Sequence, residues 1–427
     1  MKKYMKRYVD EELKDILECM GAVLIVGPKW CGKTTTASQF AKTIIELQHP
    51  TLGESYIDLV DNDPLLLFEG EKPILIDEWQ MAPKLWDAVR YSVDKSEGYG
   101  LYILTGSTIV DNSKIEHSGV GRIHRMVMRP MSLYESGDSN GKISLIDLFN
   151  DDNVKINGIT SDLSLKDIIF LASRGGWPET LNIENKKNQL KVASSYFNAI
   201  CQDDTYTFDG IKRDSNLFEA ILKSYSRNIS TLVANTKLMK DIEENYGKIS
   251  EPTFYSYISA LKNLFVIDNL PAWTPNIRSK QKIRKSEKKE FIDPSIAVAG
   301  LGATPDILFH DLKTFGFIFE TLCIRDLKVY SSSLGGKLMY YNDGKLEVDC
   351  IVELADGRYG LFEFKLGDKR IDDGAKSLLK IDKLIKEKIA SGETHIPEPS
   401  FLAVITGDKI AKIRKDGVMI IPIGTLR

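Results

Sequence analysis

The chain has 427 residues, with 57 Lys and Arg side chains against 60 Asp and Glu, and a formal net charge of −3. Hydrophobic residues make up 43% and charged residues 27%, which is the balance of a globular chain with two or three domain cores. The near-neutral charge excludes nucleic-acid binding by bulk charge, so any DNA contact needs a local basic patch.

Cysteine usage and hydropathy indicate the compartment. The five cysteines are scattered and lack the CxxC spacing of a zinc or redox site, so we expect free thiols in a reducing compartment. The basic N-terminus turns acidic without the apolar run of a signal peptide, and no stretch approaches the roughly 20 apolar residues of a membrane span. We therefore expect a cytoplasmic protein without a membrane partner.

Three short apolar runs mark the first 135 or so residues. Residues 22–26 (AVLIV), 73–78 (PILIDE) and 101–106 (LYILTG) have the length and aliphatic content of buried parallel strands. Each is followed by a turn or a helical pattern. Strand–helix alternation of this kind predicts a three-layer α/β/α domain.

The first of these strands leads into GPKWCGKT, which fits the phosphate-binding pattern GxxxxGK[ST], and the predicted helix TTASQFAKTII follows. In such a loop the backbone N–H groups curl around the β-phosphate, Lys33 reaches the β- and γ-phosphates, and Thr34 ligates Mg²⁺. The predicted ATP-binding residues are Gly27, Pro28, Lys29, Trp30, Cys31, Gly32, Lys33, Thr34, Thr35 and Ser107.

The second strand ends in two acids, Asp77 and Glu78. After a P-loop at normal spacing, an apolar strand with this ending indicates a Walker B strand. Asp77 is then expected to hold Mg²⁺ together with Thr34. Glu78 is placed to polarise the attacking water as general base, so Glu78 and Lys33 are the main predicted catalytic residues.

The third strand ends in small hydroxyl residues, so Thr105 or Ser107 can sense the γ-phosphate. A plain strand-to-turn transition explains the same residues equally well. The segment GVGRIHRMVMR then supplies Arg122 and Arg125, and arginine can stabilise charge on a transferring phosphoryl group from its own or a neighbouring subunit. A structural basic strand is the alternative for these arginines, and a homo-oligomer is an open expectation.

Residues 163–273 have a mostly helical pattern. Short helices at 231–235, 238–246 and 253–264, followed by the apolar strand 265–270, predict a winged helix, although its third helix carries few basic groups. The basic run 278–289 (RSKQKIRKSEKK) has the charge to contact DNA phosphates. A solvated linker is the alternative reading of that run.

The remaining residues, 290–427, return to an α/β pattern, with strands expected in 338–354, 359–367 and 401–407. Asp349 lies on one strand, and Glu363 and Lys365 lie on one face of the next. Two carboxylates plus a lysine can hold Mg²⁺ and activate water against a phosphodiester, and Glu320 on the helix at 316–327 completes the acid cluster. These residues predict a nuclease-like site, which can also lose its activity while its fold persists.

This order of motifs resembles a large prokaryotic family of AAA-type P-loop ATPases fused to a C-terminal domain with a restriction-endonuclease-like core. The resemblance covers nearly the whole chain and is carried by GAVLIVGPKWCGKTTTA, PILIDEWQMAPKLWDAVRYSVD, LYILTGS, GVGRIHRMVMRPMSLYE, RGGWPE, KKEFIDPSIA, GFIFE and LEVDCIVE with YGLFEFKLG. It implies ATP binding and hydrolysis, a winged-helix middle, and a PD-(D/E)XK-like end. Glu320, Asp349, Glu363 and Lys365 match the nuclease-like core by position.

We therefore predict a P-loop ATPase domain in residues 1–160, a helical winged-helix domain in 161–275, and an α/β restriction-endonuclease-like domain in 276–427. The predicted function is Mg-dependent ATP hydrolysis that gates the C-terminal nuclease-like or DNA-associated domain. Two alternatives stay open. The protein is then either an ATP-dependent DNA nuclease or a slow, ATP-bound switch that recruits a protein partner.

Overall fold

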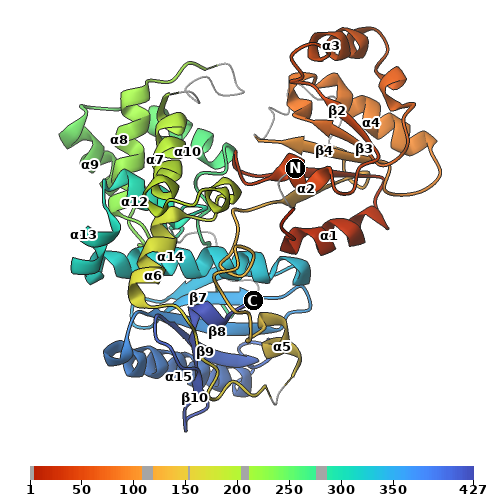
Figure 1. Ribbon diagram of the computed structural model, residues 1–427. Coiled ribbons are helices and arrows are strands. Elements are labelled where there is room, and N and C mark those ends of the chain that lie inside the picture. Colours follow the sequence, from red (N-terminus) through yellow and green to blue (C-terminus); the bar gives the residue numbers. More distant parts are fainter. Residues whose placement is uncertain (1–3, 108–118, 152–153, 203–210, 276–285) are drawn as a thin grey trace. The chain divides into compact units, whose positions relative to one another are not determined.

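A computed structural model describes residues 4–107, 119–151, 154–202, 211–275 and 286–427 (Figure 1). The chain divides into two compact units. The first unit comprises Met1–Pro130, Asp204–Arg213 and Ile258–Val266, and the second comprises Met131–Asp203, Asp214–Tyr257 and Ile267–Arg427. The three-domain division expected from the sequence stays a prediction. Among the described residues, no helix is both long enough and apolar enough to cross a membrane.

The first unit alternates strands and helices along the chain. Its elements are α1 (Tyr8–Leu17), β1 (Ala22–Val26), α2 (Lys33–Ala37), β2 (Thr43–Glu46), α3 (Gly53–Asn62), β3 (Ile74–Asp77), α4 (Lys84–Lys95), β4 (Tyr102–Gly106) and β5 (Ile123–Val127). The strands form one sheet in the order β2-β3-β4-β1-β5, and all of its neighbouring pairs are parallel. The three strands predicted from apolar runs are confirmed as β1, β3 and β4.

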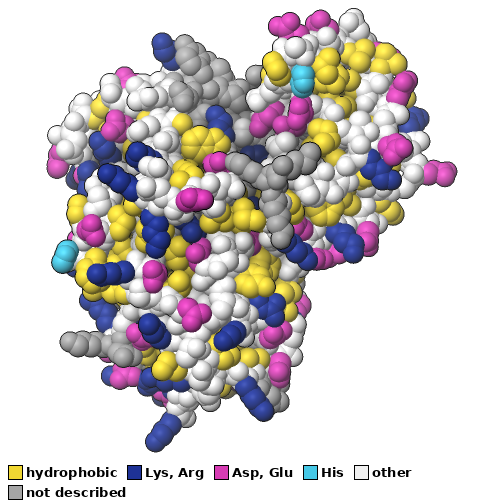
Figure 2. Space-filling model, in the orientation of Figure 1, with side chains coloured by type: hydrophobic (Ala, Val, Ile, Leu, Met, Phe, Trp, Pro, Cys, Tyr) yellow, Lys and Arg dark blue, Asp and Glu magenta, His cyan; other side chains and the backbone are white. Residues whose placement is uncertain are grey.

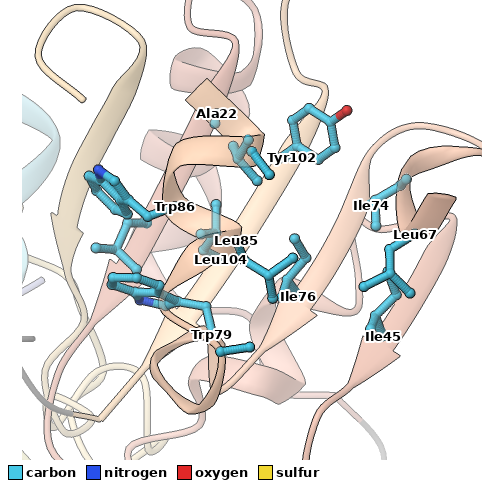
Figure 3. Close-up of a cluster of buried hydrophobic side chains, with 14 of the residues drawn as sticks. Ala22, Ile45, Leu67, Ile74, Ile76, Trp79, Leu85, Trp86, Tyr102 and Leu104 are labelled. Carbon is cyan, nitrogen blue, oxygen red and sulfur yellow. The ribbon is translucent and has the colours of Figure 1, made fainter. Parts of the chain in front are cut away.

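Both faces of this sheet are covered, which explains the continuous apolar runs of its central strands, Ala22–Val26, Ile74–Ile76 and Tyr102–Leu104. On one face, Leu24, Ile76 and Leu104 pack with Leu85 and Trp86 of α4. Figure 3 shows this cluster, in which Trp86 lies beside Trp79 with ring centroids 4.9 Å apart. On the other face, the intervening strand residues pack against α1 and α2. The predicted three-layer arrangement is therefore present.

One local expectation for the first unit is wrong. The helix expected over TTASQFAKTII ends at Ala37, and Thr43–Glu46 forms the edge strand β2 instead. The basic segment around Arg125 forms strand β5, which pairs with β1, as the alternative of a structural basic strand expected. Thr43–Glu46 and Ile123–Val127 are both rich in β-branched residues or alternate apolar with polar side chains, so each suits the edge of a sheet that the rest of the domain completes.

The second unit has helices followed by a mixed sheet. The elements assigned to it are α5 (Leu145–Asn150), α6 (Leu165–Arg174), α7 (Lys186–Gln202), α8 (Ser215–Arg227), α9 (Asn235–Asn245), α12 (Pro294–Gly300), α13 (Pro305–His310), α14 (Leu312–Tyr330), β6 (Lys337–Asn342), β7 (Glu347–Glu353), β8 (Tyr359–Lys365), α15 (Asp368–Ala390), β9 (Phe401–Thr406), β10 (Lys412–Ile413) and β11 (Met419–Pro422). Helix α10 (Glu251–Asn263) begins in this unit's residues and ends in those of the first unit.

The second unit's sheet has the order β10-β11-β9-β8-β7-β6. Strands β6, β7 and β8 are antiparallel, whereas β9 runs parallel to both β8 and β11. Figure 1 shows α14 on one face of the sheet and α15 on the other, and α15 buries Ala375, Leu378 and Ile381 against the strands. The predicted strands of this region and the helix expected at 316–327 are confirmed, while a restriction-endonuclease-like fold is not shown.

The expected winged helix is only partly matched by the local structure. Helices α9 and α10 occupy the second and third predicted positions. Residues 231–234 are not helical, so the first of the three predicted helices is wrong. The apolar segment 265–270 makes isolated bridges, Ile267 with Phe291 and Leu270 with Lys288, rather than a regular strand.

Candidate functional site

The loop between β1 and α2 has the backbone conformation that its sequence predicts. Gly27 has φ 155° and lies so close to Met128 that a Cβ atom would be 2.1 Å from its carbonyl oxygen. Gly32, which caps α2, has φ 100°, and Trp30 adopts φ 66° with 49% of its surface exposed. The two glycines therefore permit a tight loop that ends directly at the N-terminus of a helix.

Lys33 is folded back over this loop. Its Nζ donates hydrogen bonds to the carbonyl oxygens of Gly27 at 3.0 Å and Pro28 at 2.9 Å, and the residue is only 6% exposed. These acceptors are dipoles without net charge. The ammonium is thus held inside the loop in a position from which phosphate oxygens can replace the two carbonyls.

The structure brings Thr34 and Asp77 together, although 42 residues separate them in the chain. Thr34 Oγ1 donates a hydrogen bond to Asp77 Oδ1 at 2.7 Å, and the Thr105 hydroxyl donates to the same oxygen. Thr105 belongs to β4, which lies between β1 and β3 in the sheet. The two residues predicted to hold Mg²⁺ therefore lie together at the carboxyl end of the parallel strands. Thr105 positions the Asp77 carboxylate through its hydrogen bond.

Glu78 follows Asp77 in a strained backbone conformation, with φ 54° and ψ 47°. Its carboxylate accepts hydrogen bonds from the Gln80 amide and from the Ser107 hydroxyl, the latter at 3.3 Å. A left-handed conformation at a non-glycine residue needs support from its surroundings, and such strain gathers at functional sites. Gln80 and Ser107 thus orient the Glu78 carboxylate. Direct contact between Ser107 and a nucleotide stays a prediction.

The structure does not bring Arg122 and Arg125 to the loop. Arg122 directly precedes β5 and pairs with Asp94 at 2.7 Å. It lies at the amino end of the parallel strands, because Ile123 is opposite Ala22, the first residue of β1. The P-loop follows the other end of β1, and a five-residue strand is about 13 Å long. Arg125 lies in mid-strand, with its guanidinium 5.3 Å from the Trp86 ring centroid. A role for either arginine at the same chain's loop therefore has no geometric support.

Arg7 is a site residue that the sequence analysis missed. Its guanidinium donates to the carbonyl oxygens of Cys31, in the loop, at 2.9 Å and of Arg129, just after β5, at 2.8 Å. Arg7 is 5% exposed although it precedes the first helix. No local motif marks it, because its partners lie 24 and 122 residues away.

The second unit holds a separate cluster of charged side chains, and it contains all four residues predicted for a nuclease-like site. Lys365 Nζ lies 3.0 Å from Asp349 Oδ2 and 2.5 Å from Glu363 Oε2. Asp349 Oδ2 also accepts the backbone N–H of Phe364 at 2.9 Å. Asp349 comes from β7, Glu363 and Lys365 from β8, and Glu320 from α14.

A fifth member of this cluster, Lys288, was assigned to the basic run by the sequence analysis. Its Nζ pairs with Glu320 Oε1 and lies 3.9 Å from Asp349 Oδ1, and its side chain is only 2% exposed. The neighbouring Lys289 is also buried and donates to Asn235 Oδ1 at 2.9 Å. These two lysines therefore present no surface charge to DNA, and residues 278–285 of the run lie outside the described residues.

Burial and pairing shift the pKa values of this cluster in opposite directions. Burial raises the pKa of Glu363 to about 8, with the nearby Asp349 carboxylate adding to the shift. Burial also raises the pKa of Glu320 well above its usual range, against the opposing charge of Lys288. Burial alone would raise the pKa of Asp349, but Lys365 and Lys288 hold it below its usual value. Asp349 is therefore the most firmly ionised acid of the three.

A pocket of about 610 Å³ opens above part of this cluster. Glu320, Asp349 and Lys365 line it, and Lys313 and Arg370 add positive charge. The pocket lies where the first turns of α14 and α15 face the end of β8. Within the described residues, no group of three or more His, Cys, Asp or Glu side chains has an arrangement suited to a metal ion.

Three known families match separate stretches of the chain. An AAA domain matches residues 20–137, a domain of unknown function (DUF8612) matches residues 165–306, and a second domain of unknown function (DUF4143) matches residues 315–426. The AAA-domain match spans the loop, both acids and β5, and it supports a P-loop ATPase. The other two descriptions name neither a winged helix nor a nuclease. No curated protein matches the chain.

Two solved structures are distantly similar. The Walker-type ATPase PABY2304 of Pyrococcus abyssi is 14% identical, with a TM-score of 0.45 over 70% of this chain and 96% of that one. The STAND protein PH0952 from Pyrococcus horikoshii, a signal transduction ATPase with a tetratricopeptide repeat sensor, is 12% identical, with a TM-score of 0.23 over 76% and 48%. At such distances the AAA-domain match and the geometry of the first unit carry the assignment.

Proposed function

We propose that the first unit binds Mg·ATP in the loop Gly27–Thr34 and hydrolyses its γ-phosphate. The observation that carries this proposal is the meeting of Thr34 and Asp77 at 2.7 Å beside the buried Lys33. A P-loop hydroxyl and a strand-end carboxylate are the ligands that hold Mg²⁺ in P-loop NTPases, so these residues fit the ion. When bound, Mg²⁺ would neutralise negative charge that develops on the phosphates.

The roles of the remaining residues follow from their positions. Backbone N–H groups of the loop and the N-terminus of α2 bind the phosphates, and Lys33 exchanges its two carbonyl partners for phosphate oxygens. Glu78 accepts a proton from the attacking water, with Gln80 and Ser107 orienting its carboxylate. Thr105 fixes Asp77 from the neighbouring strand.

An arginine supplied by a second copy of the chain is part of the earlier expectation. Arg122 keeps about half of its side-chain surface exposed, so a neighbouring subunit can approach it. Its distance from the loop of its own chain requires such a route. The homo-oligomer and an arginine supplied by the neighbouring subunit are therefore one prediction. Mixing Arg122→Ala chains with Lys33→Ala chains tests it, because the intact loop of the first can then meet the intact Arg122 of the second and recover ATP hydrolysis.

Steady-state hydrolysis by the wild type, Glu78→Gln and Glu97→Gln tests the ATPase proposal. Glu97 is exposed and serves as the matched control for loss of a glutamate charge. Losing a general base lowers the rate by a factor on the order of 100 or more, so we expect Glu78→Gln to bind ATP and to hydrolyse it about 100-fold more slowly. Glu97→Gln should behave as the wild type.

The same experiment separates the ATPase from its main rival. A wild-type rate no higher than that of Glu78→Gln, with ATP binding intact, would contradict hydrolysis and favour the slow ATP-bound switch. Hydrolysis with and without DNA at several salt concentrations tests the predicted coupling to DNA. On the face shown in Figure 2, Lys and Arg side chains are interspersed with Asp and Glu rather than gathered into one patch.

A further inference from the structure

The charged cluster of the second unit has an order that a metal site lacks. Its five side chains alternate in sign, running Glu320, Lys288, Asp349, Lys365 and Glu363. The two carboxylate oxygens of Asp349 face different lysines, Oδ1 towards Lys288 at 3.9 Å and Oδ2 towards Lys365 at 3.0 Å. Each acid is therefore already next to a cation that belongs to the chain.

Lys288 is the member that a nuclease-like site does not need. The sequence reading of that site uses two carboxylates, a lysine and an added glutamate, which Asp349, Glu363, Lys365 and Glu320 supply. Lys288 enters from a separate segment, where its backbone exchanges hydrogen bonds with Leu270 at 2.9 and 3.1 Å. Its ammonium lies between Glu320 and Asp349, which is where an ion shared by these two acids would have to bind.

Displacing this ammonium is unfavourable for electrostatic reasons. Lys288 is buried, and its ammonium lies against the carboxylates of Glu320 and Asp349, which hold it in place by charge. A divalent ion entering beside it would meet a positive charge at about 4 Å with little water to screen it. Mg²⁺ also requires near-octahedral oxygen coordination, and Lys288 takes up the oxygens that would provide it.

We propose that Lys288 is a resident counter-ion that takes the place of a divalent metal between Glu320 and Asp349, so that the pocket beside them binds no catalytic Mg²⁺ or Mn²⁺. The cluster then keeps the side chains expected for a nuclease-like site but binds no metal ion. This inference goes beyond the ATPase proposal and is independent of it. It also predicts that removing one side chain opens a metal site in the full-length protein.

Mn²⁺ binding, measured by electron paramagnetic resonance on the full chain without nucleotide, tests the proposal. The proteins are the wild type, Lys288→Met and Lys289→Met, each with and without Asp349→Asn. Only Mn²⁺ binding that is lost with Asp349→Asn is assigned to this cluster, which separates it from any binding at Asp77. Lys289 is the matched control because it is adjacent, buried and held by a neutral amide.

We expect no Asp349-dependent Mn²⁺ site in the wild type or in Lys289→Met. Lys288→Met should gain one, with Asp349-dependent affinity for Mn²⁺ at least about tenfold above that of the wild type, because a unit charge about 4 Å from the ion is removed. Should Lys288→Met fail to fold, Lys288→Gln keeps a hydrogen-bond donor to Glu320 without the charge. For that variant, added Mn²⁺ should raise Tm only when Asp349 is present.

Two results would overturn the proposal. One is an Asp349-dependent Mn²⁺ site in the wild type, or metal-dependent DNA cutting by the wild type that Asp349→Asn abolishes. The other is a folded Lys288→Met or Lys288→Gln protein that gains no Asp349-dependent site. A failure of ATP hydrolysis affects neither measurement, so the two proposals stand or fall separately.

Discussion

The two units each bury a lysine beside a polar site, but they compensate its charge differently. In the first unit, the partners of Lys33 are the backbone carbonyls of Gly27 and Pro28. In the second, Lys288 and Lys365 face three carboxylates. A lysine held by dipoles remains attractive to phosphate, whereas a lysine held by carboxylates is already neutralised. The same residue type therefore builds a ligand site in one place and an internal salt-bridge chain in the other.

Replacing one lysine in each unit gives the largest effects and the most direct test of this contrast. We expect Lys33→Met to lower ATP hydrolysis by a factor on the order of 100 or more, because the phosphates lose their charged donor. Lys365→Met should leave ATP hydrolysis unchanged. It should destabilise folding by about 3 kcal/mol, because Asp349 and Glu363 lose the cation that they share. Steady-state kinetics and urea unfolding of both variants measure these effects.

The opposite pattern would break the comparison. If Lys365→Met folded as stably as the wild type, its carboxylates would have to be solvated or neutral without it. If Lys33→Met kept the wild-type rate, the loop would not be the catalytic site. Each variant serves as the control for the other, since both remove one lysine ammonium, from the buried Lys33 or the partly buried Lys365.

A smaller effect is expected where the first unit supports its loop from a distance. Arg7→Lys should raise KM for ATP roughly tenfold with a smaller change in kcat, because one ammonium cannot hold the Cys31 and Arg129 carbonyls in the fork geometry of arginine. Lys6→Ala is the neighbouring control, since its side chain is 74% exposed and pairs with Glu11. Equal loss of kcat with KM unchanged would argue against a positioning role for Arg7.

The last expected effect is spread over several pH units and concerns the second unit. Because the pKa of Glu363 is raised to about 8, the folded protein binds its proton more tightly than the unfolded chain does. Folding stability should therefore fall as pH rises from about 4.5 towards 8, by at most about 1.4 kcal/mol per pH unit from this group. Glu363→Gln should show a flatter dependence in urea unfolding between pH 6 and 8.

Glu347→Gln is the control for this titration, because Glu347 is exposed at the start of the same pair of strands. It should follow the wild-type pH dependence. Identical slopes for the wild type and Glu363→Gln would show that Glu363 is ionised throughout this range. That result would contradict the raised pKa of Glu363 and would mean that Lys365 holds it as a full ion pair.

The sequence predicted the central part of the first unit well because each signal there is local. The glycines that shape the loop, the lysine that fills it and the acids that end β3 occur within short segments. It failed at β2, where Thr43–Glu46 continued a helical pattern, and it offered the basic strand Ile123–Val127 only as one of two readings. Edge strands acquire their identity from the strand beside them, and that partner is distant in the chain.

The candidate sites show the same division. The sequence named Asp349, Glu363 and Lys365 from their alternation on strands, but it placed Lys288 in a basic run, read as a DNA contact or a solvated linker, and overlooked Arg7. It also proposed that Arg122 stabilises the phosphates bound by the loop. Only the register of β5 on β1 shows that Arg122 lies at the opposite end of the strands from the loop. A run of charged residues in the sequence shows composition alone. The burial of each side chain depends on the distant segments that pack against it.

By itself, the sequence determined the phosphate-binding loop, the acid-tipped strand and the layered α/β class of the first unit, because glycine freedom and hydrophobic periodicity act over a few residues. Tertiary structure alone decided which charges meet, as Lys288 meets Glu320 and Arg7 meets Cys31. The strength and availability of a charge depend on the groups and the water around it. In a folded chain those surroundings come from segments that the local sequence does not contain.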